Sequence, residues 1–410
     1  MKWKEGIPMS DAIAKKTNAA FQTAKLTSYW LELAGLPEAV EYSRLIHLDQ
    51  ELDPKMILHS RDMCFLNPVI HEIRYGSINA FIERSGCRNI LDIACGYSPR
   101  GLLFARKGYH YVGADLPVVA EQLCEVVREL HLEGLEYVGA DATNYDSLKA
   151  AFDRMSGPVC IVVEGLGMYL SAHEAETVRR NITCLLSERE GSCYVTTDPG
   201  NGYLFHAVIT SLYPPNQTMM RFGQLFEMYN WASDGGITYE TAKRPIEDDI
   251  EMYRRMGMTV EMVPLLPEGT RLRAFDRLPE EAVQALSKAM TKPLLLTGSA
   301  AGVVSVKTEK DEVPFSLESK KTDGMLQIKV SGRLDSLSAP ELMRCFESSR
   351  DEIDRVVIDL SDTSFVSAAG GRVFYQIRKA LGEDNRLILK GQSGEVAQEI
   401  ETDDIIRHVD

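Results

Sequence analysis

Apolar segments alternate with helix-forming segments between residues 89 and 197, and this alternation constrains the fold more than any other feature of the chain. The apolar segments predict strands over Ile90–Ile93, Tyr109–Ala114, Leu135–Gly139, Cys160–Val163 and Ser192–Thr197. The intervening segments predict helices over Gly101–Arg106, Val118–Leu130, Tyr145–Met155 and Ala172–Ser187. Such alternation is typical of an α/β fold with a doubly wound parallel sheet. Nearly continuous apolar strands are expected when helices cover both faces of that sheet.

The segments on either side complete this first domain. Residues 10–85 predict helices, one of them from Leu66 through Ile82. Residues 200–250 are rich in aromatic residues and methionine, and they predict a cap near the C-terminal edge of the sheet. A helix over Ile246–Met256, a strand over Thr259–Val263 and a final strand at Leu294–Thr297 follow.

A second, smaller α/β domain is predicted near the C-terminus. Its predicted elements are Met325–Val330, Ala339–Arg350, Arg355–Leu360, Gly370–Leu381, Arg386–Lys390 and Glu395–Glu401. The charged segment 307–314 ends in proline and predicts the linker. The expected domains are therefore 1–306, with a helical region over 1–85 and a cap over 200–250, and 315–410.

Composition excludes several classes of partner. The net charge of −15 argues against nonspecific nucleic-acid binding, which needs a basic surface. The longest apolar stretch, 293–306, is too short to span a bilayer. No two cysteines have the Cys-x-x-Cys spacing, so buried reduced thiols are expected and no metal site. We therefore expect a cytoplasmic protein that binds neither nucleic acid nor a membrane.

Polar residues follow successive predicted strands, where ligands bind in open α/β sheets. A turn of small residues, with Ala94 and Gly96, follows the first strand and lets backbone N–H groups face a ligand. Asp115 ends the second strand and can accept hydrogen bonds from ribose hydroxyls. Asp141, beside Ala142, follows the third strand, and Glu164 follows the fourth. This arrangement predicts a nucleoside-binding site.

With these residues the chain resembles class I S-adenosylmethionine (AdoMet) methyltransferases of the leucine carboxyl methyltransferase type, a group that includes polyketide O-methyltransferases. The resemblance covers roughly residues 60–300. The matching strings are Leu91-Asp-Ile-Ala-Cys-Gly96, Val112-Gly-Ala-Asp-Leu-Pro-Val-Val119, Asp141, and Glu164-Gly-Leu-Gly-Met-Tyr-Leu170. The chain departs from the family where Ala94 replaces a glycine, and where no acid follows Gly96 at the usual spacing.

The resemblance implies AdoMet as cofactor and a role for each matching residue. Asp115 is expected to bind the ribose and Asp141 the adenine amine. Gly96 is expected to lie against the methionine part, and Glu164 near the methionine amine. The family also places an arginine before the first strand to pair with the AdoMet carboxylate. Arg74 is the best match to it, and Arg61 is the second.

The acceptor is less well specified by the sequence. Methyl transfer to a carboxylate or an acidic phenol needs positioning and desolvation more than a strong base. Tyr169 and Tyr203 are candidates to orient an acceptor, and His206 is the candidate base. A packing or surface role remains the alternative for His206, and the aromatic cap is either a substrate pocket or a self-packed lid. We expect O-methylation of a small molecule or a peptide.

Residues 315–410 resemble a STAS domain, the fold of anti-sigma-factor antagonists and of the tails of sulfate transporters. The matching strings are Gly332-Arg-Leu-Asp-Ser336, Val356-Val-Ile-Asp-Leu360 and Phe365-Val-Ser-Ala-Ala-Gly-Gly-Arg-Val373. Ala368 stands where family members carry a phosphorylated serine, and Ser367 is offset by one. The resemblance therefore implies constitutive association with a protein partner or with another copy of the chain. An alternative for the whole chain is a non-catalytic regulatory protein that acts through this domain on an anti-sigma factor or a kinase.

Overall fold

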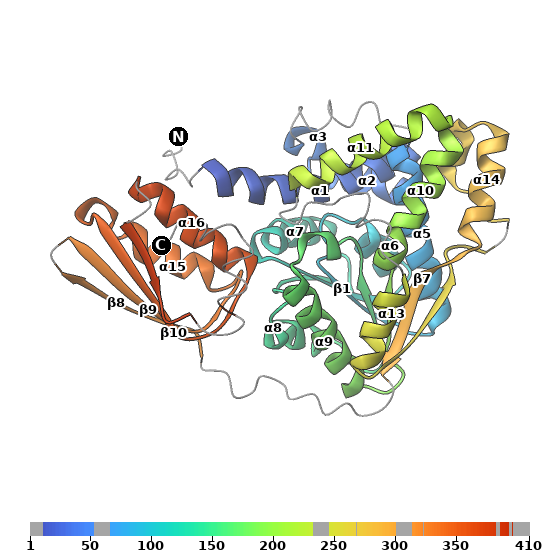
Figure 1. The fold of residues 1–410 in the computed structure, drawn as a ribbon. Helices are drawn as coiled ribbons and strands as arrows, with labels where there is room; N and C mark the ends of the chain where they lie inside the picture. Colours follow the sequence, from blue (N-terminus) through green and yellow to red (C-terminus); the bar gives the residue numbers. More distant parts are fainter. Residues whose placement is uncertain are drawn as a thin grey trace. The chain divides into compact units, whose positions relative to one another are not determined.

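The computed structural model of the chain describes residues 11–52, 66–232, 246–267, 269–300, 314–322, 324–382, 386–392 and 396. Two compact units are present (Figure 1). The larger spans residues 19–170 and 175–306, and the smaller contains the chain after residue 306. The candidate Arg61, most of the predicted linker, part of the predicted cap and most of the helix expected over 395–401 lie outside the described residues.

The larger unit is built on a seven-stranded sheet in the order β3-β2-β1-β4-β5-β7-β6. The strands are β1 (Asn89–Ile93), β2 (His110–Asp115), β3 (Leu135–Gly139), β4 (Val159–Val163), β5 (Cys193–Thr196), β6 (Met258–Pro264) and β7 (Pro293–Ala300). Strands β1 to β5 pair in parallel, in the strand order of doubly wound nucleotide-binding sheets. This confirms the predicted fold class. The chain order reverses between β1 and β4, where ligands bind in such sheets.

The sheet is not parallel throughout. Strand β7 lies between β5 and β6 and runs antiparallel to both. The alternation of strands and helices predicts parallel neighbours, but it carries no information on the direction of a strand that is inserted later between two others. The prediction of a parallel sheet, which was drawn from residues 89–197, therefore holds for β1 to β5, and no direction was predicted for β7.

Helices cover both faces of this sheet, as the apolar strands predict (Figure 1). One face packs against helices that belong to a single core: α1 (Asp11–Ala34), α2 (Pro37–Leu45), α5 (Leu66–Ser85), α6 (Arg100–Arg106), α7 (Pro117–Leu130), α10 (Asn201–Leu212), α11 (Pro215–Ala232) and α14 (Glu280–Met290). The opposite face packs against α8 (Tyr145–Phe152), α9 (Ala172–Glu188) and α13 (Ile246–Arg255). Alternate residues of β4 pack into the hydrophobic cores on the two faces of the sheet. Cys160 and Val162 lie in the first core, and Ile161 and Val163 lie in the core on the opposite face. Short elements α3 (Leu48–Glu51), η2 (Gly167–Tyr169), η3 (Asp198–Gly200) and η4 (Arg273–Arg277) complete the unit.

The smaller unit contains a four-stranded sheet in the order β11-β10-β9-β8. Its elements are β8 (Ser316–Thr322), β9 (Met325–Leu334), α15 (Ala339–Glu347), η5 (Arg350–Glu352), β10 (Arg355–Val366), α16 (Ala368–Leu381) and β11 (Leu387–Lys390). Strand β8 is an exposed edge strand that pairs antiparallel with β9. Its polar residues show no apolar alternation, so this strand was not predicted from the sequence. In the described part of the chain, no helix is both long and apolar enough to cross a bilayer.

Gly113 of β2 provides a test of the packing under the candidate site. A Cβ atom at this position would lie 2.5 Å from Cδ1 of Tyr137 and 2.9 Å from Sγ of Cys95. We expect Gly113→Ala to lower the free energy of unfolding by about 1–3 kcal/mol, because the added methyl group overpacks the core. Urea unfolding measures this change. Gly223→Ala is the control, because a Cβ there meets nothing within 4 Å. An equal loss in both variants would contradict the packing argument.

Candidate cofactor site

The turn after β1 brings the backbone close to the acid at the end of β2. Ala94 (φ 54°) and Gly96 (φ 51°) both adopt the left-handed backbone conformation. For alanine this conformation is strained, and such strain is often found at functional sites. The N–H of Gly96 donates to Oδ2 of Asp115 at 2.7 Å, and the N–H of Leu116 donates to Oδ1 at 2.7 Å. The glycine turn and the acid therefore meet, as the spacing of the two motifs predicts.

The carboxylate of Asp115 is held by these backbone donors in a poorly solvated position. Burial raises the pKa of Asp115 to about 6, although the two backbone N–H groups act in the opposite direction. An ionised carboxylate has about four acceptor positions, so two backbone donors leave room for two more. Asp115 can therefore accept a pair of neighbouring hydroxyl groups from a ligand.

Asp141 lies at the end of the neighbouring strand. Ala140 N–H donates to the carbonyl of Asp115 at 2.7 Å, which links the ends of β2 and β3. The Asp141 side chain is buried, and its Oδ1 accepts from both the backbone N–H and the hydroxyl of Thr143, at 2.8 and 2.7 Å. The carbonyl of Ala142 accepts from Nδ2 of Asn181 at 3.0 Å. The strand-end position is as predicted, and the local bonds fix the direction of the carboxylate.

Glu164, directly after β4, is held between two buried arginines. Its Oε2 lies 2.6 Å from an Nη atom of Arg100, and its Oε1 lies 3.4 Å from Nε of Arg74. The side chains of Arg74 and Arg100 are only 4% and 1% exposed. Charged side chains so deeply buried need partners, because an unpaired buried charge is strongly destabilising. Glu164 is a charged partner of both arginines.

Further polar groups complete this network. Arg100 also pairs with Asp92 of β1 at 2.8 Å and donates to Oδ1 of Asn79 at 2.9 Å. Arg74 donates to Oγ1 of Thr197 at 3.3 Å, and its Nη2 lies 3.9 Å from Oδ1 of Asp198. Burial disfavours the charged form of Arg100, but Asp92 and Glu164 raise the pKa of its guanidinium.

The acids at this edge of the sheet outnumber the bases. The network contains the two guanidinium groups of Arg74 and Arg100. The carboxyl groups described above number five and belong to Asp92, Asp115, Asp141, Glu164 and Asp198. Burial raises the pKa of Asp92 and of Asp198 as well as that of Asp115. A nearby cation stabilises the ionised form of buried carboxyl groups that outnumber the positive charges around them. The site is therefore suited to a ligand that carries positive charge.

Helix α1 lies against the glycine turn. A Cβ atom at Gly96 would lie 3.3 Å from Cβ of Ala24, so a larger residue there would press on the helix. Ser28 donates a hydrogen bond to the carbonyl of Tyr97, and Nζ of Lys25 lies 5.1 Å from the centroid of the Tyr97 ring. The N-terminal helix is thus part of the surroundings of the candidate site.

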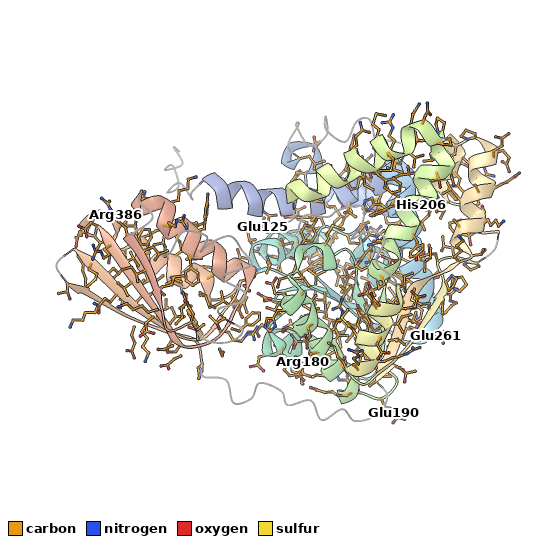
Figure 2. All side chains as sticks on the ribbon, viewed as in Figure 1. Glu125, Arg180, Glu190, His206, Glu261 and Arg386 are labelled. Carbon is orange, nitrogen blue, oxygen red and sulfur yellow. The ribbon has the colours of Figure 1, made fainter. Side chains whose placement is uncertain are left out.

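The three candidate acceptor residues differ in position. Tyr169 is half-buried at the end of η2, which is tied to the network because Gly165 and Gly167 donate to the carboxylate of Asp198 at 2.7 and 3.1 Å. Tyr203 of α10 is 47% exposed. His206, one turn further along α10, is exposed (Figure 2). Its ring centroid lies 5.8 Å from that of Phe222. The segment of Tyr169 is thus bonded to the buried network, and α10 joins the same network through Asn201, whose Nδ2 donates to Oδ1 of Asp198 at 3.4 Å.

Three further residues belong to the network although no role was predicted for them from the sequence: Asp92, Arg100 and Asp198. Asp92 offered a signal, because an acid inside an otherwise apolar strand requires a buried partner. The sequence gives no such signal for Arg100 and Asp198, since charged residues are common in turns after strands. Their partners lie 8 to 124 positions away, and only the packing of the sheet identifies them.

Comparison with known proteins identifies the smaller unit. Residues 316–406 match the STAS domain family, which confirms the predicted C-terminal STAS domain. No curated protein sequence matches the chain.

Three solved structures are similar to the chain at low identity. An O-methyltransferase family protein from Burkholderia thailandensis is 14% identical, with a TM-score of 0.32 over 58% of this chain and 59% of its own. The match thus spans about three-fifths of that protein's length. Mitomycin 7-O-methyltransferase MmcR is 17% identical, with a TM-score of 0.31 over 63% and 60%. Geranyl diphosphate C-methyltransferase from Streptomyces coelicolor A3(2) is 12% identical, with a TM-score of 0.33 over 56% and 78%.

Proposed function

We propose that the larger unit binds AdoMet and transfers its methyl group to an oxygen acceptor on a small molecule or a peptide. One observation carries the proposal: the N–H of Gly96, in a strained turn, bonds directly to the carboxylate of Asp115 at the end of the next strand. This places a backbone suited to close ligand approach beside an acid that can bind two ribose hydroxyls. The excess of carboxylates around it suits the positively charged sulfonium.

In this proposal each strand-end residue holds one part of the cofactor. Asp115 accepts from the ribose hydroxyls, and Asp141, beside Ala142, accepts from the adenine amine. Ala94 and Gly96 line the methionine part, whose amine lies near Glu164. Nη2 of Arg74 is 3.9 Å from Asp198, beyond hydrogen-bond length, so the guanidinium keeps donor capacity for the methionine carboxylate. When bound, AdoMet supplies a methyl group on a sulfonium leaving group.

Calorimetry tests the binding step directly. AdoMet and S-adenosylhomocysteine are titrated into the full chain at tens of micromolar. We expect saturable binding of one molecule per chain. Adenosine is the control ligand, and it should bind more weakly because it lacks the methionine part that Arg74 and Glu164 are proposed to hold. Absence of binding of AdoMet and S-adenosylhomocysteine at these concentrations would contradict the proposal.

The STAS domain supports a second role for the chain, association with a protein partner or with another copy of itself. Ser367 is buried, and its hydroxyl accepts from the N–H groups of Ala369 and Gly370, capping α16. Ala368, which stands where members of the STAS family carry a phosphorylated serine, has no hydroxyl group, and this supports constitutive association. Pull-down with the full chain tests it, with Tyr375→Lys as a surface variant because Tyr375 of α16 is 43% exposed. A stable partner together with no methyl transfer to any acceptor would favour the regulatory alternative over the enzyme.

A further inference from the structure

Three buried side chains near Arg74 have polar atoms without a hydrogen-bond partner among the described residues. Both amide atoms of Asn67, both ring nitrogens of His71 and Oδ1 of Asn201 are in this state. Asn67 is 0% exposed, His71 3% and Asn201 8%. Buried polar groups are nearly always paired, because an unpaired one loses its bonds to water without replacement. Several unpaired groups in one region indicate a place where a polar ligand binds.

These residues lie beside the proposed cofactor site. Asn67, His71 and Arg74 occupy positions i, i+4 and i+7 of α5, and therefore share one face of the helix. Asn201 donates from Nδ2 to Oδ1 of Asp198 at 3.4 Å, the same oxygen that lies 3.9 Å from Arg74. The unpaired atoms thus extend the polar network of Arg74 and Asp198 along α5 and onto the first turn of α10.

The ring of His71 is held in a defined plane and is neutral. It stacks on Trp30 of α1 with 4.5 Å between the ring centroids and an interplanar angle of 28°. Burial, and to a smaller extent the charge of Arg74, lower its pKa well below the usual value. A neutral imidazole carries one N–H donor and one nitrogen lone pair, so His71 can accept a hydrogen bond from a hydroxyl group.

The charged residues of the network determine whether a neutral or an anionic acceptor is favoured. Arg100 is paired with Asp92 and Glu164, the free donor capacity of Arg74 is assigned to the methionine carboxylate, and the acids are in excess. A carboxylate acceptor would meet this negative charge without a free cationic partner. A neutral hydroxyl compound can instead donate to an imidazole nitrogen or an amide oxygen, at no electrostatic cost.

We propose that Asn67, His71 and Asn201 form the acceptor site, and that it takes a neutral phenol or enol rather than a carboxylate. The inference rests on the proposed AdoMet function. The acceptor O–H donates to the unprotonated nitrogen of His71, and the amide of Asn67 donates to the acceptor oxygen or a neighbouring one. The oxygen forms a bond to the methyl carbon as the carbon–sulfur bond breaks and its electron pair passes to sulfur. The proton moves to His71, which gives a methyl ether, S-adenosylhomocysteine and an imidazolium.

Nuclear magnetic resonance of the full chain with isotope-labelled histidine tests this site. Phenol and benzoate, probes of similar size, are added at millimolar concentration with and without S-adenosylhomocysteine. The His71 ring signals are assigned by their loss in His71→Gln. We expect phenol, and not benzoate, to shift these signals. His71→Gln and Asn67→Leu should weaken phenol binding about tenfold, and His131→Asn, at an exposed histidine after α7, should leave it unchanged.

The outcomes separate the two proposals. Binding of S-adenosylhomocysteine is measured first, and its failure would count against the AdoMet function. Unmoved His71 signals, tighter binding of benzoate than of phenol, or undiminished phenol binding in His71→Gln would each overturn the acceptor site. Phenol binding is measured both with and without S-adenosylhomocysteine. The results therefore test the acceptor site whether or not the cofactor binds.

Thermal unfolding separates a binding role from a structural one. In the described structure His71 makes no internal hydrogen bond, so His71→Phe should leave the melting temperature unchanged or raise it by about 2–6 °C. Asn79→Leu on the same helix is the control, because Asn79 accepts from Arg100 at 2.9 Å and its loss should lower the melting temperature. A lower melting temperature in His71→Phe, with unchanged phenol binding, would assign His71 to packing.

Discussion

Replacement of Arg100 by methionine is expected to lower the free energy of unfolding of the larger unit by about 3–5 kcal/mol, the cost of removing one partner from a buried ion pair. Arg100 is 1% exposed and pairs with both Asp92 and Glu164. Methionine fills a similar volume but leaves these two carboxyl groups without their shared cation. Calorimetric unfolding at pH 7 measures the loss.

Another arginine of the same helix provides the control. Arg106 pairs with Glu41 at 2.5 Å, but both side chains are at least 40% exposed. Exposed ion pairs contribute between zero and about 1 kcal/mol, so Arg106→Met should have little effect. Equal losses in the two variants would show that burial does not decide the strength of these pairs.

The loss in Arg100→Met should also depend on pH. Burial already raises the pKa of Asp92, and the guanidinium of Arg100 opposes this. Without Arg100 the pKa of Asp92 rises further above its value in the unfolded chain. A carboxyl group with a raised folded-state pKa destabilises the fold as the pH increases through that value. The difference between the variant and the natural protein should therefore be smaller at pH 5 than at pH 7, and a constant difference would contradict the proposed pairing.

Replacement of Asp115 by asparagine is expected to weaken AdoMet binding by about 1–3 kcal/mol, or roughly 5- to 150-fold. The amide nitrogen of asparagine cannot accept a hydrogen bond. One of the two backbone donors, Gly96 or Leu116, therefore loses its partner, and the ribose hydroxyls lose an ionised acceptor. Titration calorimetry at pH 7.5 measures the change. Glu121→Gln is the control, because Glu121 is an exposed acid on the helix that begins two residues after Asp115.

The pH dependence of AdoMet binding follows from the same residue. The pKa of Asp115 is raised to about 6, so the carboxylate is ionised at pH 7.5 and protonated at pH 5. Protonation removes acceptor capacity, and affinity should fall by up to about tenfold for each pH unit below 6. Folding stability depends on pH in the opposite direction to AdoMet binding. The contribution of Asp115 to stability is present below pH 4 and is lost as the pH rises through 6. Asp115→Asn should remove this part of the binding profile, and an unchanged profile would assign it to another group.

The position of the candidate site was predictable, whereas its electrostatics were not. The strand ends, the glycine turn and the acids at 115, 141 and 164 follow from local patterns, because a parallel sheet aligns the C-terminal ends of its strands at one edge. The ion pairs of Arg100 depend on which helix packs over which strand. The unpaired atoms of His71 depend on every neighbour that packs around α5, and no spacing in the sequence predicts them.

By itself, the sequence determined the order and boundaries of most strands and helices, the strand-end acids and the STAS domain, since these depend on side-chain periodicity and on residues close together in the chain. The tertiary structure alone decided the antiparallel course of β7 and the pairing of the polar edge strand β8. It also decided that Arg74 and Arg100 share Glu164. Strand pairing and burial bring distant residues together, and the energy of a charge depends on the partners and the solvent that the folded protein leaves around it.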